Sequence, residues 1–189
     1  MTRSFAAVFP PPEVRQRVRE LSGELQKSAG GVKWVETDNL HLTLRFFGNL
    51  TDAQLESAGA CMTETARGEA PFAVRLATLG AFPSLSRVRV IWVGIEEGAE
   101  QLTRVANSLE RRFVEAGLGR TDKPFSPHLT IGRVKVPQGN PRLEEAIRAL
   151  TFEGAEFMID GLTLTKSELR PGGPIYSPVV VAKLGVAEQ

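Results

Sequence analysis

Only two histidines occur in this chain of 189 residues, and both begin nearly the same short motif. His41 begins the run HLTLR, and His128 begins the run HLTIGR in the second half of the chain. Histidine is the side chain whose unperturbed pKa lets it accept or donate a proton near neutral pH. The repeated motif therefore predicts a duplicated site that holds two proton-transfer groups.

Both motifs are rich in β-forming residues, and alternate residues of a strand point to opposite faces. This parity predicts that His41, Thr43 and Arg45 share one face, with leucines on the other face anchoring the strand in the core. His128 and Thr130 share a face in the same way. Because a threonine hydroxyl can donate to an anionic oxygen, each motif is expected to present an imidazole beside a phosphate-holding group.

Two such pairs facing each other across a cleft would suit an in-line displacement at phosphorus. One neutral imidazole takes a proton from the attacking oxygen, and the other, protonated, gives one to the leaving oxygen. The two threonines hold the non-bridging oxygens, and Arg133 or Arg45 offsets the charge that builds up in the transition state. This scheme requires no metal and no cofactor.

The two candidate arginines differ in strand parity. Arg133 stands at an odd offset from His128, so an ideal strand would send it to the opposite face. It reaches the phosphate only if the strand ends, twists or bulges there, which Gly132 permits. Arg45 has the required parity, and its alternative role is that of a solvated cation at the edge of the groove.

Composition limits the other possibilities. A formal net charge of +1 excludes a strong global field, and no apolar stretch is long enough to span a bilayer. Neither histidine has the neighbouring carboxylates or cysteines of a metal site. The one cysteine, Cys61, cannot form an internal disulfide, which favours a reducing compartment. We expect a cytoplasmic monomer with no membrane partner and no bound metal.

Alternating strand and helix patterns run along the whole chain. Helices are predicted where apolar residues recur at helical spacing, with a capping box at Thr51 and Gln54 and a cap at Asn140 before Pro141. Extended segments are predicted at about Phe5–Phe9, Lys33–Phe47, Phe72–Leu79, Val88–Ile95, Phe125–Val136, Glu156–Leu169 and Ser177–Leu184. This order predicts a single α+β domain over residues 1–189, bilobal, with two pseudo-symmetric lobes of mostly antiparallel sheet, flanking helices and a central cleft that carries the two His-x-Thr strands.

These residues also resemble a known family. Beyond the two motifs, the likeness extends to RSFAAV from Arg3, to NLHLTLRFFG from Asn39, to SPHLTIGR from Ser126 and to GPIY from Gly173. Essentially the whole chain resembles the two-histidine (2H) phosphoesterase superfamily, and within it the bacterial and archaeal 2′-5′ RNA ligases, also called RNA 2′,3′-cyclic phosphodiesterases.

The resemblance implies a bilobal α+β fold and assigns roles to individual residues. His41 and His128 would be the acid–base pair, Thr43 and Thr130 the phosphate ligands, and Arg133 the arginine that ends the second motif. The implied reaction opens a 2′,3′-cyclic phosphate at an RNA end to a 2′-phosphate without a metal. An RNA 5′-hydroxyl in place of water would join two ends through a 2′-5′ bond. We assign the water-activating base to His128 and the acid to His41, with the swapped assignment left open.

The substrate side of the site is less determined by the sequence. The partner is an RNA with a 2′,3′-cyclic phosphate end or a cyclic nucleotide, and Tyr176, Phe46 or Phe47 would stack on a base. Basic residues that would accept an RNA strand, or be ordinary solvated charges, are Lys33, Arg87, Arg89, Arg120, Lys123 and Arg170. Two alternatives remain: a non-catalytic module that binds RNA ends, and a metal-dependent hydrolase.

Overall fold

The computed structural model describes residues 1–28, 30–135 and 140–185. In chain order its elements are β1 (Thr2–Val8), α1 (Pro12–Ser28), β2 (Val32–Trp34), β3 (Leu42–Leu50), α2 (Asp52–Arg67), β4 (Phe72–Phe82), β5 (Val90–Glu97), α3 (Ala99–Glu115), β6 (His128–Val134), α4 (Pro141–Ala149), β7 (Ala155–Ile159), β8 (Gly161–Arg170) and β9 (Gly173–Lys183). Short 3₁₀ turns precede β3 at Thr37–Asn39 and β5 at Leu85–Arg87.

The helices form where the apolar spacing predicts them. The Thr51 hydroxyl accepts from the Gln54 backbone N–H at 3.3 Å, and the Gln54 side chain accepts from the Thr51 N–H at 2.9 Å, which is a complete capping box at the start of α2. The Asn140 side chain caps α4 by accepting from the Leu143 N–H at 3.1 Å. These caps satisfy backbone donors that a helix start would otherwise leave unpaired.

The strands of the described residues form one nine-stranded sheet in the order β7-β4-β5-β6-β3-β1-β8-β9, with β2 paired to β6. All of these pairings are antiparallel. The predicted mixture of helices with antiparallel strands is therefore confirmed. Among these residues no helix is long and apolar enough to cross a membrane.

Two predicted extended segments are not single strands. Lys33–Phe47 contains the end of β2, the 3₁₀ turn and the first part of β3. The segment Glu156–Leu169 is also divided between two strands, because the β-structure is interrupted at Asp160 between β7 and β8. β7 pairs with β4, whereas β8 pairs with β1 on the other side of the sheet. The second motif strand also begins at His128 rather than Phe125, and the predicted end at Val136 lies outside the described residues.

The strand order is symmetric about the junction of β3 and β6. β1 and β5 flank this pair, followed outward by β8 and β4 and then by β9 and β7. β3 and β6 share a single register pair, Leu42 with Leu129, and each of these leucines directly follows a histidine. The order divides the sheet into a first lobe (β1, β3, β8, β9) and a second lobe (β4–β7, with β2), with the strands arranged alike on both sides of the junction, as the predicted pseudo-symmetry requires.

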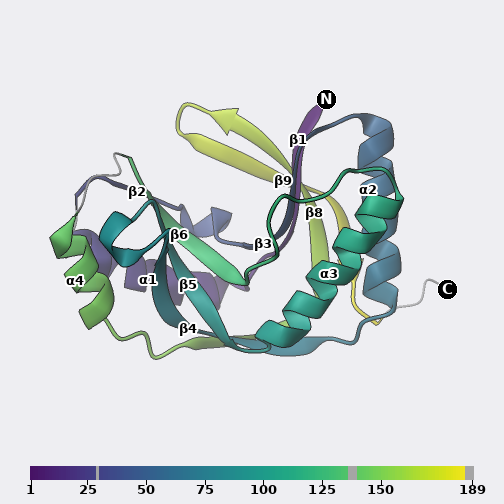
Figure 1. Cartoon of the computed structure of the whole chain (residues 1–189). Helices are drawn as coiled ribbons and strands as arrows, with labels where there is room; N and C mark the ends of the chain where they lie inside the picture. Colours follow the sequence, from purple (N-terminus) through teal and green to yellow (C-terminus); the bar gives the residue numbers. More distant parts are fainter. Residues whose placement is uncertain (29, 136–139, 186–189) are drawn as a thin grey trace.

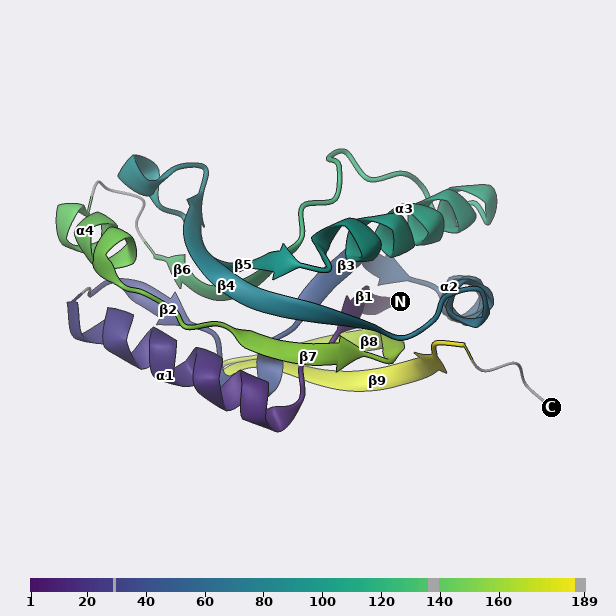
Figure 2. The same ribbon diagram turned by 90° about the horizontal axis from the view of Figure 1, so that it is seen from below.

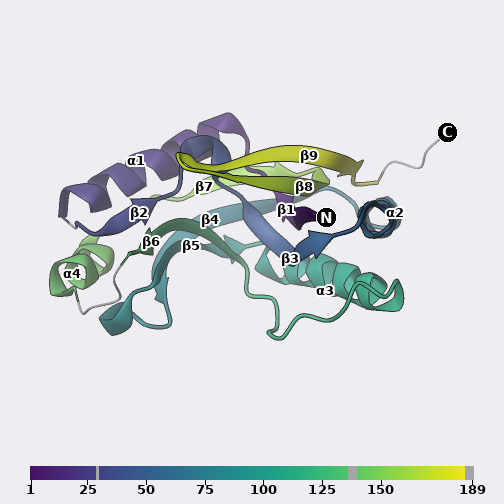
Figure 3. The same cartoon turned by 90° about the horizontal axis from the view of Figure 1, so that it is seen from above.

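The lobes are interlocked rather than being the two halves of the sequence. α1 and α4 pack together and cover the second lobe, where α1 contacts β7 and β6 and α4 contacts β4. α2 covers β8 and β9 of the first lobe, and α3 packs on α2, β3 and β5. Figure 1 shows these two helix pairs at opposite ends of the molecule, and Figures 2 and 3 show the curved sheet between them.

We predict that the lobe junction depends on Leu129, which is fully buried between His128 and Thr130. Leu129→Ala should lower the free energy of unfolding by about 2–5 kcal/mol, measured by denaturant titration, because it removes buried methyl groups and leaves a cavity. Leu129→Met, which nearly conserves volume, should cost less than about 1.5 kcal/mol. Equal costs for the two variants would contradict the packing role.

Candidate active site

His41 lies immediately before β3 and is held by its backbone and by aromatic rings. Its Nδ1 lies 2.7 Å from the carbonyl oxygen of Asn39. A carbonyl can only accept, so Nδ1 carries the hydrogen and Nε2 is the atom left to exchange protons. The ring centroids of Phe5, Phe9 and Tyr176 lie 4.7, 5.5 and 5.3 Å from that of the imidazole.

His128 begins β6 and makes the same kind of backbone hydrogen bond beside a different set of aromatic rings. Its Nδ1 lies 2.7 Å from the carbonyl oxygen of Ser126, again two residues earlier. Phe82 packs edge-on against the imidazole with centroids 5.0 Å apart, and Trp92 lies at 6.4 Å. Both imidazoles are thus fixed in the same tautomer by the same local hydrogen bond, with Nε2 available for chemistry.

The register pair Leu42–Leu129 places the two motifs side by side. In an antiparallel arrangement, the positions next to this pair set His41 opposite Thr130 and Thr43 opposite His128. Each imidazole therefore lies opposite the motif threonine of the other lobe. The predicted meeting of the two His-x-Thr units is found.

A β-bulge in the second motif determines the position of Arg133. Trp92 of β5 pairs with Thr130, and the next residue, Ile91, pairs with Gly132, so Ile131 is the extra residue of β6. The extra residue reverses the alternation of side chains along β6 from this point on. Arg133 is exposed and therefore lies on the same face of the strand as Thr130. The parity condition stated above for Arg133 is met by this bulge.

Close packing against β2 explains why a glycine stands at position 132. A Cβ on it would lie 2.9 Å from Cγ1 of Val32 and 3.1 Å from Cε3 of Trp34. The missing side chain therefore lets β2 lie close against the bulged strand.

The same bulge in the first motif turns Arg45 away, so its predicted place on the groove face is wrong. Ala6 of β1 pairs with Arg45 and Ala7 pairs with Thr43, which leaves Leu44 as the extra residue. After the bulge, Arg45 points with the leucines into the protein, and Phe46 takes the groove face.

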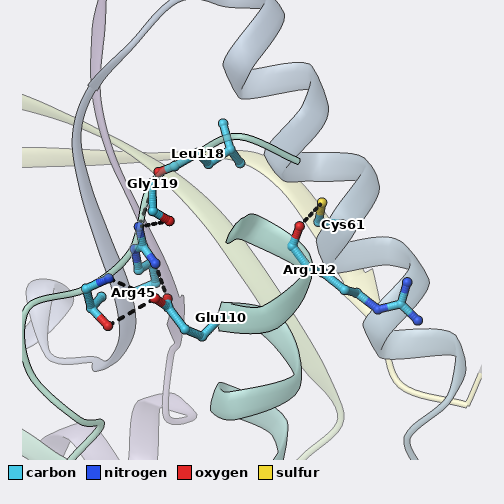
Figure 4. Close-up of polar contacts among 7 residues, drawn as sticks. Arg45, Cys61, Glu110, Arg112, Leu118 and Gly119 are labelled. Carbon is cyan, nitrogen blue, oxygen red and sulfur yellow. Dashed lines mark hydrogen bonds and ion pairs between the residues drawn. The ribbon is translucent and has the colours of Figure 1, made fainter. Parts of the chain in front are cut away.

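Arg45 is a buried structural cation. It is 6% exposed, forms an ion pair with Glu110, and donates hydrogen bonds to the carbonyl oxygens of Leu118 at 3.2 Å and Gly119 at 3.1 Å. Figure 4 shows these bonds converging on the guanidinium. Its guanidinium also lies 5.3 Å from the ring centroid of Phe47. Arg45 thus ties β3 to α3 and to the loop that leads to His128.

A cavity of about 500 Å³ opens beside His41. It is lined by Arg3, Phe5, His41, Thr43, Phe46, Arg133, Ser167, Leu169, Pro174 and Tyr176. Two arginines and no carboxylate stand among these described residues, so the cavity suits an anion. His128 and Thr130 lie outside this lining, and Arg133 is its one described residue from the second lobe, so the cavity lies mainly over the first lobe.

The cavity contains some of the predicted substrate residues and not others. Tyr176 and Phe46 line it, whereas half-buried Phe47 packs edge-on against Phe113 with centroids 4.8 Å apart. None of the six basic residues predicted to accept RNA lines it; Arg120 and Lys123 line a different pocket, and Arg170 pairs with Glu168. Sequence reasoning missed Arg3, although its alternation with Phe5 on the first strand was a usable signal.

Burial is the main influence on both imidazoles. It lowers the pKa of His41, against the opposing effect of the Asn39 carbonyl, and the charges of Arg133 and His128 lower it further. Burial also lowers the pKa of His128, with the Ser126 carbonyl opposing it and Arg133 adding to it. The charge of Arg133 thus acts on both imidazoles. Among the described residues no group of three or more His, Cys, Asp or Glu is arranged to hold a metal ion.

We predict that both histidines titrate below the ordinary imidazole pKa of about 6.5. Because the Arg133 charge disfavours the imidazolium form, Arg133→Met should raise the pKa of both, and added inorganic phosphate should do the same. Proton NMR titration can follow this, since the chain has only two histidines. Arg148→Met, an exposed cation on α4, is the control. Unchanged pKa values in Arg133→Met would contradict the effect of the Arg133 charge on the two imidazoles.

Comparison with known proteins identifies the family. The model of the 2′-5′ RNA ligase superfamily matches residues 10–170. The RNA 2′,3′-cyclic phosphodiesterase of Methanothermobacter thermautotrophicus is 36% identical over 183 residues, covering 96% of this chain and 98% of that protein. The Archaeoglobus fulgidus protein of the same name is 37% identical over 180 residues, covering 95% and 98%.

Solved structures agree with the fold. A crystal structure of a Thermus thermophilus protein superposes with a TM-score of 0.79 at 34% identity, over 97% of this chain and 98% of that one. Escherichia coli LigT complexed with 3′-AMP gives a TM-score of 0.77 at 23% identity over the same fractions, which supports the fold alone. The chain belongs to the 2′-5′ RNA ligase superfamily.

Proposed function

We propose that this protein is an RNA 2′,3′-cyclic phosphodiesterase that opens a terminal cyclic phosphate to a 2′-phosphate. The observation that carries the proposal is the pair of imidazoles in the same tautomer, one from each lobe, with Arg133 acting on both. Its relatives in Methanothermobacter and Archaeoglobus carry the same activity in their names. General acid–base catalysis at phosphorus needs two such groups on opposite sides of the reacting atom.

The position of the cavity supports an assignment of the acid and the base. Because it extends from His41 over the first lobe, the ribose that carries the cyclic phosphate lies on the His41 side. The 3′-oxygen that leaves is then next to His41, and the attacking water is next to His128 on the opposite side. We therefore assign His41 as the acid and His128 as the base.

Each proton and bond is accounted for in this scheme. His128 takes a proton from water as the new phosphorus–oxygen bond forms, and His41 gives its proton to the 3′-oxygen as that bond breaks. Thr43 and Thr130 donate to the non-bridging oxygens, and Arg133 offsets the negative charge of the transition state. Exchange with solvent restores the starting protonation of both imidazoles. An RNA 5′-hydroxyl in place of the water forms a 2′-5′ bond by the same steps, and their reversal cleaves it.

The alternative of a non-catalytic RNA-end module fits the site less well. Binding alone would be served by fixed cations, whereas burial lowers the pKa of both histidines and favours their neutral form. We also propose that the chain acts as a cytoplasmic monomer, since one chain supplies both imidazoles and all residues of the cavity.

The direct test is hydrolysis of an RNA with a 2′,3′-cyclic end in the presence of EDTA. We expect turnover to a 2′-phosphate, and we expect His41→Ala and His128→Ala each to lower kcat by about 10²–10⁴-fold, the usual contribution of one acid or base. Chromatography against 2′- and 3′-phosphate standards identifies the product. Activity that survives in the double variant, or that requires an added metal, would contradict the proposal.

The acid and base can be told apart with a substrate whose 3′-bridging oxygen is replaced by sulfur. A thiolate leaves without being protonated, so the sulfur substrate should largely restore the rate of His41→Ala. His128→Ala should stay slow on both substrates, because water still needs a base. Rescue of His128→Ala instead would exchange the two roles.

A further inference from the structure

The cavity continues past the catalytic histidine to an arginine held on an aromatic ring. The guanidinium of Arg3 lies 4.6 Å from the ring centroid of Phe46. Phe46 is 48% exposed, unusual for a phenylalanine, and the bulge in β3 places it at the groove face. A cation over an aromatic face is attracted by the ring, so Phe46 orients Arg3 without neutralising it.

Arg3 has no carboxylate partner among the described residues, whereas Arg45, Arg75 and Arg148 each have one. The side chain is exposed and lines the cavity, in which no carboxylate stands. Burial raises the pKa of Tyr176, which also lines the cavity, and the charges of Arg133 and Arg3 both oppose that rise. Among the residues that the structure describes, the cavity therefore holds a second cation without a carboxylate partner, besides Arg133.

Strand geometry gives an estimate of how far Arg3 lies from the histidine. Arg3 and Phe5 are alternate residues of β1 and share a face, and Phe5 contacts the His41 imidazole with centroids 4.7 Å apart. Arg3 is thus two residues further along the strand, about 7 Å of strand rise. A single ribose spans a comparable distance between the phosphates on its 3′ and 5′ sides.

We propose that Arg3, held on Phe46, binds the phosphate on the 5′ side of the terminal nucleotide. The proposal rests on the proposed function and adds a residue to it: Arg3 makes the phosphate on the 5′ side of the terminal nucleotide part of what the enzyme recognises. Arg133 serves the reacting phosphate and Arg3 the preceding one. The ring face that Phe46 turns to Arg3 is therefore used to orient the cation, not to stack a base.

Three substrates test the proposal: uridine 2′,3′-cyclic phosphate, the same compound with a 5′-phosphate, and UpU with a 2′,3′-cyclic end. The wild-type kcat/KM should be about tenfold higher for the two that carry a phosphate on the 5′ side. Arg3→Met should remove this preference while changing the rate on uridine 2′,3′-cyclic phosphate less than about twofold. Phe46→Leu should reduce the preference in part, and Arg148→Met should leave it unchanged.

Salt gives a second readout, because each phosphate contact to a single strand contributes about −0.7 to the slope of log binding against log salt. Arg3→Met should reduce that slope for the UpU substrate by about this amount, and Arg3→Lys, which keeps the charge, should not. An equal loss on all three substrates, or no loss on any, would overturn the proposal.

A binding measurement tests the Arg3 site independently of the proposed function. Calorimetry with uridine 2′-phosphate, with and without a 5′-phosphate, should show an Arg3-dependent gain in affinity whether or not the protein hydrolyses anything. Absence of hydrolysis with this gain intact would contradict the function alone. Hydrolysis without the gain would contradict the Arg3 site alone.

Discussion

The site depends on one contact, the register pair of Leu42 and Leu129 at which the two lobes meet. Both leucines are almost completely buried, and burying one such side chain contributes about 1.5–3 kcal/mol. Each leucine stands between the histidine and the threonine of its own motif. The hydrophobic anchor that holds the lobes together therefore also sets the two imidazoles beside each other. A shift of one residue in either strand at this pair would turn the His-x-Thr unit of that strand into the core.

The second determinant is the bulge that each motif strand carries directly after its threonine. The extra residues Leu44 and Ile131 reverse the alternation at equivalent positions of the two lobes. The same device has opposite effects on the two arginines, since it brings Arg133 to the cleft and sends Arg45 to Glu110. It also makes Phe46 the counterpart of Arg133, so the two lobes share a backbone plan but present different side chains. Because of this difference, the two sides of the cleft are chemically distinct.

Much of this could be predicted from residue types and spacing. Helix caps at Thr51 and Asn140 and the paired His-x-Thr units depend on local chemistry, which a single sequence carries. The position of Arg45 could not be predicted, because a bulge is a property of two paired strands and the pairing is set by long-range contacts. The end of β7 at Asp160 could not be predicted for a similar reason. Buried residues continue from β7 into β8, although the chain passes there from one lobe to the other. The alternation of Arg3 with Phe5 could have indicated its face of β1, but its contact with Phe46 depends on the pairing of β1 with β3.

The proposed mechanism places two imidazoles from pseudo-symmetric lobes on opposite sides of one phosphorus atom, with the ribose on the His41 side. A crystal structure with uridine vanadate, a mimic of the five-coordinate transition state, tests this placement most directly. We predict Nε2 of His41 at the apical oxygen that belongs to the ribose and Nε2 of His128 at the opposite apical oxygen. Both imidazoles on one side of the vanadium, or the ribose oxygen at His128, would contradict it.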